Sequence, residues 1–186
     1  VLERDGEPPP PTNDEAWDSW NRTGVSQVRQ PHGFIGKTRA VLVEELPDVW
    51  AGVQQSATYT HDLARFAPDP DAVTDEDRKR LRAEVMRRTT FDRLMALAAE
   101  AEPNLHVQRG VAVTGLKTVS PHPTGVPNNR GVTTENGDIE AELVVDSGGR
   151  RSAAPRWLDA LGAPVEQWSE SDGFTYHSMW FRTHDG

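Results

Sequence analysis

The stretch LVVDSGGRRSAAPRWLDALG (143–162) decides the fold that we expect for this chain. Three apolar residues, Leu143 to Val145, run into Asp146, a glycine turn and two arginines. A continuously apolar run is typical of a strand covered on both faces, as in the interior of an α/β sheet. Glycines permit close backbone approach and arginine adds charge, so the turn is a candidate cofactor-binding or phosphate-binding site. An ordinary strand–turn–helix link with an aspartate cap is the alternative interpretation.

The residues on either side of this run predict a hairpin before it and a helix after it. Glu135-Asn136-Gly137-Asp138 separates residues 132–134 from IEAELVVD (139–146), and Asn-Gly supplies the positive φ that a tight turn needs. The helix is expected to include Trp157, Leu158 and Leu161, with Gly162 as its C-cap. The final stretch, GFTYHSMWFR (173–182), predicts a long strand.

Helical spacing dominates the middle of the chain. A helix is expected from Lys37, limited or kinked by Pro47 and continued at Trp50. Residues 56–73 predict loop or edge strand, because closely spaced prolines and aspartates break regular structure. Two more helices, with a short break, form an expected helical insert at about 74–102.

Both helices of the insert have candidate starts. Thr74 with Asp77, and Thr89 with Asp92, resemble capping boxes, in which a threonine and an acid three residues later share hydrogen bonds with the backbone. The apolar stripe of the first helix is expected to comprise Leu81, Val85 and Met86. After Pro103 the apolar period changes to two, which predicts a bent hairpin or bulged strand over 105–116.

The chain opens with VLERDGEPPPP (1–11), which reads as a strand end followed by an extended proline segment. In a dinucleotide-binding βαβ unit, an acid at the end of the second strand accepts hydrogen bonds from the adenosine ribose hydroxyls. Glu3 is suited to that role because a carboxylate offers two acceptor oxygens to a vicinal diol. A solvated surface glutamate is the alternative.

Composition excludes several classes of function. The net charge of −9 over 186 residues argues against nucleic acid or an anionic membrane as partner, and no apolar run is long enough to span a bilayer. The absence of cysteine excludes disulfides, thiolate metal sites and cysteine catalysis, and a cytoplasmic setting is expected. No GxSxG motif anchors hydrolase chemistry. Paired metal-ligand spacing is missing among the six histidines, His32, His61, His106, His122, His177 and His184.

Together these stretches resemble the FAD-dependent monooxygenases of the aromatic hydroxylase type, whose relatives include flavin halogenases and geranylgeranyl reductases. Residues 143–162 resemble the Asp-Gly motif region of that family, and VLERD (1–5) resembles the second strand of its FAD-binding fold. Residues 24–50 resemble the segment of that family in which a histidine-containing turn and a basic residue lie close to FAD. Residues 86–116 resemble the family's arginine-led helix and the strand that follows it.

The fold that this resemblance implies is α/β. It is a partial, Rossmann-like FAD/NAD(P)-binding domain of the three-layer ββα type, followed by the beginning of a substrate-binding β-sheet. The incomplete FAD-binding domain is expected over 1–172 and the sheet from 173 to 186. In this family a strand and a GxGxxG turn precede the ribose-binding acid, so that unit is expected roughly 30 residues upstream of Glu3. The motif does not occur within the 186 residues.

The resemblance also implies which residues contact the cofactor. Glu3, followed by Arg4, matches the ribose-binding acid, and the Val113 backbone is expected to face the adenine. Lys37 stands where a flavin-contacting arginine is common, and lysine lacks the bidentate geometry of arginine. Arg88 matches an arginine that serves either a functional or a carboxylate-pairing role. The Asp-Gly motif is represented by Asp146, Gly149 and Arg150.

The expected function is FAD-dependent oxidation of a small organic molecule by a monooxygenase that uses NAD(P)H and O2. Three alternatives stay open: a reductase of the same fold, a halogenase, and a non-catalytic fragment or interaction module without bound FAD. A halogenase is disfavoured because the Trp-x-Trp-x-Ile-Pro segment typical of those enzymes is missing. Without the pyrophosphate-binding turn, the 186 residues alone are expected to be inactive. The substrate, the choice of NADH or NADPH and the oligomeric state are left open.

Overall fold

The protein is described by a computed structural model that covers residues 1–34, 36–57, 59–119, 125–170, 173, 175 and 177–181. The chain divides into two compact units. Unit 1 comprises Val1–Gly6 and Gln108–Tyr176, and unit 2 comprises Glu7–Val107 and His177–Gly186. Helices and small sheets are mixed along the chain, which is compatible with the expected α/β class. The division into domains at 1–172 and 173–186 stays a prediction.

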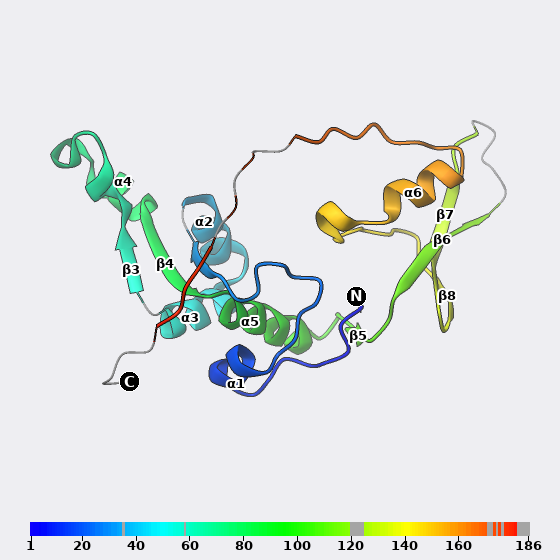
Figure 1. The fold of residues 1–186 in the computed structure, drawn as a ribbon, viewed down its shortest axis with the longest axis horizontal. Helices are drawn as coiled ribbons and strands as arrows, with labels where there is room; N and C mark the ends of the chain where they lie inside the picture. The colour runs from blue at the N-terminus through cyan, green and yellow to red at the C-terminus, as the bar shows by residue number, and fades with distance from the viewer. Residues whose placement is uncertain are drawn as a thin grey trace. The chain divides into compact units, whose positions relative to one another are not determined.

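Unit 2 contains one small sheet and a set of helices (Figure 1). Its strands are β2 (Pro31–Phe34), β3 (Tyr59–Asp62) and β4 (Arg82–Arg87). Its helices are α1 (Asn13–Asp18), α2 (Gly36–Glu45), α3 (Pro47–Ser56), α4 (Asp75–Arg80) and α5 (Arg88–Ala101), with 3-10 turns η1 (Leu63–Phe66) and η2 (Pro70–Ala72). The sheet is antiparallel in the order β2-β4-β3, with β4 at its centre.

The core of unit 2 lies between this sheet and helices α2, α3 and α5. Side chains alternate along a strand, so Met86 and Glu84 share one face of β4. Met86 packs in a cluster of buried residues completed by Phe34, Leu42, Val49, Trp50 and Val53. Burying each large side chain stabilises the folded state by roughly 1.5–3 kcal/mol.

The helix boundaries expected around Pro47 and Thr74 are confirmed. Pro47 occupies the first turn of α3, where its missing N–H costs nothing, and so separates α3 from α2. The Thr74 hydroxyl accepts from the Asp77 amide at 3.1 Å and donates to the Asp77 carboxylate at 2.7 Å. For residues 56–73 the sequence predicted either loop or edge strand, and residues 59–62 form an edge strand.

The expected helical insert is wrong between residues 82 and 87. These residues form β4, the central strand, and are not a continuation of the preceding helix. Leu81 ends α4 as its C-cap, whereas Val85 and Met86 point to opposite faces of the sheet. Pairing with β2 and β3 overrides the helical spacing and the helix-forming residues of this stretch.

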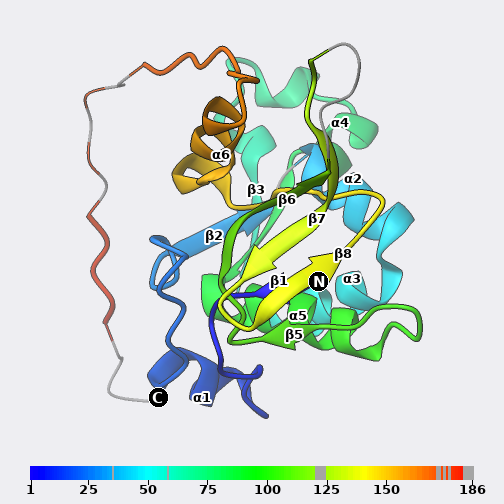
Figure 2. The ribbon, with the colours of Figure 1, turned by 90° about the vertical axis from the view of Figure 1, so that its right-hand side faces the viewer.

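The described residues of unit 1 form two small sheets, with β6, β7 and β8 seen most clearly in Figure 2. Its elements are β1 (Leu2–Glu3), β5 (Gln108–Arg109), β6 (Val113–Val119), β7 (Asn128–Thr134), β8 (Gly137–Glu140), the 3-10 turn η3 (Gly149–Arg151) and α6 (Ala154–Ala160). β1 pairs with β5 in parallel, and β6, β7 and β8 form an antiparallel sheet in that order. α6 packs against β6.

The expected hairpin and the helix near the chain's end are confirmed. Thr134 lies opposite Gly137, so Glu135 and Asn136 form a two-residue loop, and Gly137 has a φ of 115°. The bulge expected in the strand before it is present as register shifts within the β6–β7 pair. α6 is followed by Gly162 at a φ of 76°, the conformation expected of a C-cap glycine.

The strand expected at residues 143–145 is wrong. These residues lie outside every strand, and Leu143 and Val145 are 78% and 76% exposed. No helix or strand among the described residues covers residues 143–145, so these apolar side chains are not buried as the pattern predicts. The strand expected at 173–182 lies partly outside the described residues, and the residues of it that are described (173, 175 and 177–181) belong to no strand.

Candidate functional site

The first group of predicted site residues gathers at the β1–β5 pair. The parallel register places Glu3 beside Arg109, and the Val111 amide donates to the Glu3 carbonyl at 3.0 Å. The Glu3 carboxylate accepts from the Asp5 amide at 3.1 Å, which orients it at the end of the strand. The end of β1 and the segment that leads to Val113 are therefore neighbours.

Arg4 and Val113 lie on the two segments that this pairing joins. Arg4 follows β1 directly and is exposed, and Val113 begins β6 and is half-buried. Between β5 and β6 the chain bends at Gly110, whose φ of 69° is a left-handed conformation that favours glycine. This bend lets the chain leave β5 and still run past the end of β1.

The second group is the turn that follows the exposed apolar run. One oxygen of the Asp146 carboxylate accepts from the Gly148 amide at 2.8 Å, and the other accepts from the Ser152 hydroxyl. The hydrogen bond from Ser152, then that from Gly148, holds the pKa of Asp146 below its ordinary value. Because both oxygens accept hydrogen bonds within the turn, Asp146 stabilises local structure, although no strand leads into the turn and Asp146 is not a helix cap.

The same turn presents Gly149 and Arg150 to solvent. Gly149 has a φ of 63°, and a Cβ atom added there would have nothing within 4 Å. The open space would admit close approach of a ligand to the backbone, and Arg150 in η3 is exposed beside it. Asp146, Gly149 and Arg150 are thus brought together by one turn, although the buried strand expected to deliver them is missing.

Lys37 belongs to unit 2, as Arg88 does, whereas the other predicted residues belong to unit 1. It lies exposed in the first turn of α2, after Gly36 at a φ of 51°. Arg39, which sequence reasoning missed, lies in the same helix and pairs with the buried Glu84 at 3.6 Å. Its guanidinium also lies over the Trp50 ring, 5.1 Å from the centroid. Two cations therefore stand near the start of α2, one exposed and one tied to the core.

A third group links β2 to the start of α5. The Arg88 guanidinium lies 3.2 Å from Nε2 of His32 and 2.6 Å from the Asp92 carboxylate. Burial, then the charge of Arg88, lowers the pKa of His32 from its ordinary value. The carboxylate-pairing role foreseen for Arg88 is therefore confirmed. The capping box expected at Thr89 and Asp92 is wrong, since the N-cap is Arg87 and makes no side-chain bond to the helix.

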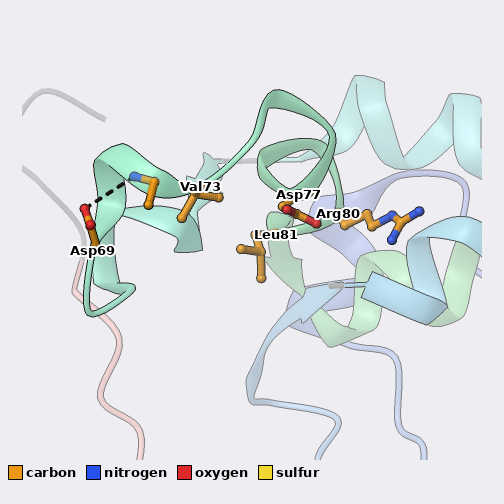
Figure 3. Close-up of a pocket in the computed structure, with 6 residues that line it drawn as sticks. Asp69, Val73, Asp77, Arg80 and Leu81 are labelled. Carbon is orange, nitrogen blue, oxygen red and sulfur yellow. Dashed lines mark hydrogen bonds between the residues drawn. The ribbon is translucent and has the colours of Figure 1, made fainter.

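A shallow hollow of about 510 Å³ lies between η2 and α4 (Figure 3). Its lining residues are Asp69, Ala72, Val73, Asp77, Arg80 and Leu81. The two carboxylates serve the local backbone, Asp69 by accepting from the Ala72 amide at 3.3 Å and Asp77 by capping α4. Arg80 pairs with Glu76 at 2.7 Å. These polar groups are already used, so the hollow is no candidate site.

Searches for other site types and for relatives add no further candidate. No group of three potential metal ligands occurs among the described residues, and no described helix has the length and apolarity to cross a bilayer. No model of a known protein family matches the chain, and no curated protein sequence matches it. The functional argument therefore rests on this chain's own residues.

Proposed function

We propose that the chain is part of an FAD-dependent oxidoreductase, with a monooxygenase that uses NAD(P)H and acts on a small organic molecule as the favoured activity. The finer fold that goes with this proposal is a partial Rossmann-like FAD-binding domain, and the cytoplasm is its proposed location. The observation that carries the proposal is the parallel pairing of β1 with β5.

The β1–β5 pair supports the proposal because the resemblance requires two distant segments to meet. The ribose-binding acid would be Glu3, and the residue facing the adenine would be Val113. These residues are far apart in sequence, yet the Val111 amide bonds to the Glu3 carbonyl. The pairing therefore supports the proposal by making these two segments neighbours.

The residues present fit the adenosine end of FAD better than its phosphate end. The half-buried Glu3 carboxylate is held at the strand end by the Asp5 amide, and a carboxylate has about four acceptor positions. Gly149 leaves backbone open to a ligand, and Arg150 adds charge beside it. Asp146 uses both oxygens within its own turn, so it would act by shaping that turn.

FAD, when bound, would supply the redox chemistry and the reaction with O2. The residues of this chain would bind and orient it. Glu3 would hold the ribose hydroxyls, and the backbone near Val113 would face the adenine. Arg150 would contribute positive charge, and a flavin contact of Lys37, in unit 2, stays a prediction. No described residue is assigned a proton-transfer role.

A second candidate function is an interaction module without FAD, and the exposed apolar run favours it. Leu143 and Val145 are more than three-quarters exposed, and contiguous exposed apolar surface often marks a protein-binding site. In that case the turn at Asp146 would be purely structural. The two candidates differ in whether Glu3 contributes to a ligand site.

A titration with FAD and FMN separates these candidates, because only FAD carries adenosine. The chain has no GxGxxG turn, so we expect FAD to bind with a Kd on the order of 1 mM, with competition by ADP. FMN should bind at least tenfold more weakly. Glu3→Gln should weaken FAD binding by about tenfold, since it removes a charge-assisted acceptor. Flavin fluorescence reports the binding.

The matched control is Glu142→Gln, which makes the same chemical change at an exposed position outside the β1–β5 pair. It should leave FAD binding unchanged. Equal binding of FMN and FAD, or equal effects of the two substitutions, would contradict the adenosine site. A complete lack of binding to the folded chain would favour the interaction module.

A further inference from the structure

β2 is joined to α5 through a half-buried group of three charged or titratable side chains, which we call the histidine cluster: His32, Arg88 and Asp92. Asp92 is 10% exposed and Arg88 28% exposed. The Asp92 carboxylate holds the Arg88 guanidinium at 2.6 Å, and that guanidinium lies 3.2 Å from Nε2 of His32. The backbone reinforces this junction, because the Arg88 amide donates to the Gln30 carbonyl at 3.2 Å.

The chemistry of the cluster determines where the proton of His32 lies. An arginine side chain has donors only and stays protonated in proteins, so Nε2 must be the acceptor in its contact with Arg88. A neutral imidazole that accepts at Nε2 carries its proton on Nδ1. Nδ1 of His32 is buried and makes no hydrogen bond of ordinary geometry to any residue that the structure describes, and the carbonyl groups of Gln30 and Pro31 favour a proton on the ring.

The junction also receives a distant segment of unit 2, residues 177–181. The indole N–H of Trp180 donates to the Arg29 carbonyl at 2.9 Å, and the Ser178 hydroxyl donates to the Gln30 side-chain oxygen. The Trp180 ring meets the Trp17 ring edge-on at 4.7 Å. Both acceptors belong to residues that directly precede β2, so a change in that turn would move the docking points of this segment.

We propose that Arg88, held by Asp92, keeps His32 neutral with its proton on Nδ1, and that this arrangement is a pH-sensitive latch that holds segment 177–181 on the turn before β2. Protonation of Nε2 would replace an acceptor by a donor. Two donors and two positive charges would then face each other at the present 3.2 Å separation. The contact would break, and β2, which directly follows the turn, would lose its side-chain link to α5.

The arrangement of charges around His32 means that protonation of this histidine, and of no other nearby group, would break its contact with Arg88. From α5 the ring faces Arg88, which disfavours its protonation, and Asp92, which favours it. From β4 it faces the apolar Met86, which lies directly opposite. The other nearby charges have their own partners: Glu84 pairs with Arg39, Arg87 with Asp14, and Arg29 donates to the carbonyls of Ala16 and Trp20.

The direction of the pH effect follows from the lowered pKa of His32. Burial and Arg88 lower this pKa below the ordinary 6.5, so the unfolded chain binds a proton more readily than the folded one. The stabilisation by the latch is therefore complete above pH 6.5. It is lost as the pH falls below 6.5 and through the folded pKa of His32. The latch does not depend on the proposed binding of FAD.

Long-range ¹H–¹⁵N NMR spectra of the whole chain test the latch, because they identify the tautomer and the titration midpoint of each histidine. The His32→Gln variant assigns the resonance. We expect a neutral ring protonated on Nδ1, with a midpoint below pH 6.5. The Trp180 indole resonance should move toward its unfolded position with the same midpoint. An Nε2-protonated ring, or a midpoint at or above 6.5, would overturn the proposal.

Substitution of Arg88 tests its role as a positioning residue. Arg88→Met should raise the His32 midpoint and remove the preference for the Nδ1 tautomer. Arg88→Lys keeps the charge and should restore part of the lowered midpoint. The matched control is Arg87→Met, which removes a neighbouring charge that pairs with Asp14 and should leave the His32 midpoint unchanged.

Each result of these substitutions bears on the proposal. Equal shifts from Arg87→Met and Arg88→Met would show a general field effect and would overturn the positioning role. A Trp180 resonance that does not follow His32 would overturn the link to segment 177–181. Should Arg88→Met fail to fold, the tautomer and midpoint of the unaltered chain still decide the proposal.

Discussion

Leu42 and Leu143 are both leucines in similarly apolar stretches, yet Leu42 is 4% exposed and Leu143 is 78% exposed. Leu42 lies in unit 2, where α2, α3 and α5 cover one face of a three-stranded sheet. Leu143 lies in unit 1, in an extended run that no described layer covers. The difference shows that an apolar pattern indicates which surface is suited to burial. Burial itself depends on a covering element elsewhere in the chain or on a partner.

The largest expected effect comes from truncating these two leucines in turn. Leu42→Ala should lower the free energy of unfolding of unit 2 by about 2–5 kcal/mol, because it leaves a cavity in a packed core. Leu143→Ala should change stability by no more than about 0.5 kcal/mol, as is usual for an exposed side chain. Denaturant unfolding and amide hydrogen exchange measure both. A cost for Leu143→Ala as large as that for Leu42→Ala would show that the exposed run is covered in solution.

A second contrast lies within the β7–β8 hairpin of unit 1 and concerns two glycines with positive φ. At Gly131 the φ is 140° and an added Cβ would lie 2.0 Å from the Ile139 carbonyl oxygen. At Gly137 the φ is 115° and nothing lies within 4 Å. Gly131→Ala should therefore destabilise the hairpin by about 3 kcal/mol, from backbone strain and a clash with backbone.

Gly137→Ala is the matched control, because it introduces backbone strain without the clash. We expect a cost of about 1 kcal/mol for it. Hydrogen exchange of the β7 and β8 amides reports both substitutions. Equal costs would mean that the close approach of β8 to Gly131 does not persist in solution, and unit 1 would then be looser than its hydrogen bonds indicate.

The smallest expected effect concerns the turn that follows the exposed run. Ser152→Ala removes the hydroxyl that donates to Asp146, so the pKa of Asp146 should rise toward its ordinary 3.8. Because the folded pKa is lowered, the turn is most stable above pH 3.8 and loosens as the pH falls through that folded pKa. A carboxyl-carbon NMR titration measures the shift. An unchanged pKa would place Asp146 outside the turn's hydrogen bonds.

Local signals in the sequence predicted the elements that depend on local chemistry. Pro47, the Thr74 cap and the turn ending at Gly137 each act within a few residues, and each boundary was predicted. β4 was missed because its residues favour a helix and only its pairing with β2 and β3 makes it a strand. The run at 143–145 was misjudged for the converse reason, since its pattern predicts burial that no described element supplies.

The candidate site was predictable to the same extent. The turn at Asp146 is local, so its residues do gather, and two hydrogen bonds within the turn hold its carboxylate. Glu3 and Val113 are far apart in sequence, and only the resemblance to FAD-dependent monooxygenases predicted that their segments would be neighbours. The histidine cluster joins positions 56 residues apart, and neither the spacing of His32 nor that of Asp92 signals the contact.

The central claim is that the end of β1 and the segment leading to Val113 form the adenosine end of a cofactor site. Amide NMR spectra of the whole chain, recorded during a titration with ADP, test it most directly. We predict that the largest shifts occur at Glu3, Val111 and Val113, and that Glu3→Gln abolishes most of them. Shifts confined to other residues, or shifts that survive Glu3→Gln unchanged, would contradict the claim.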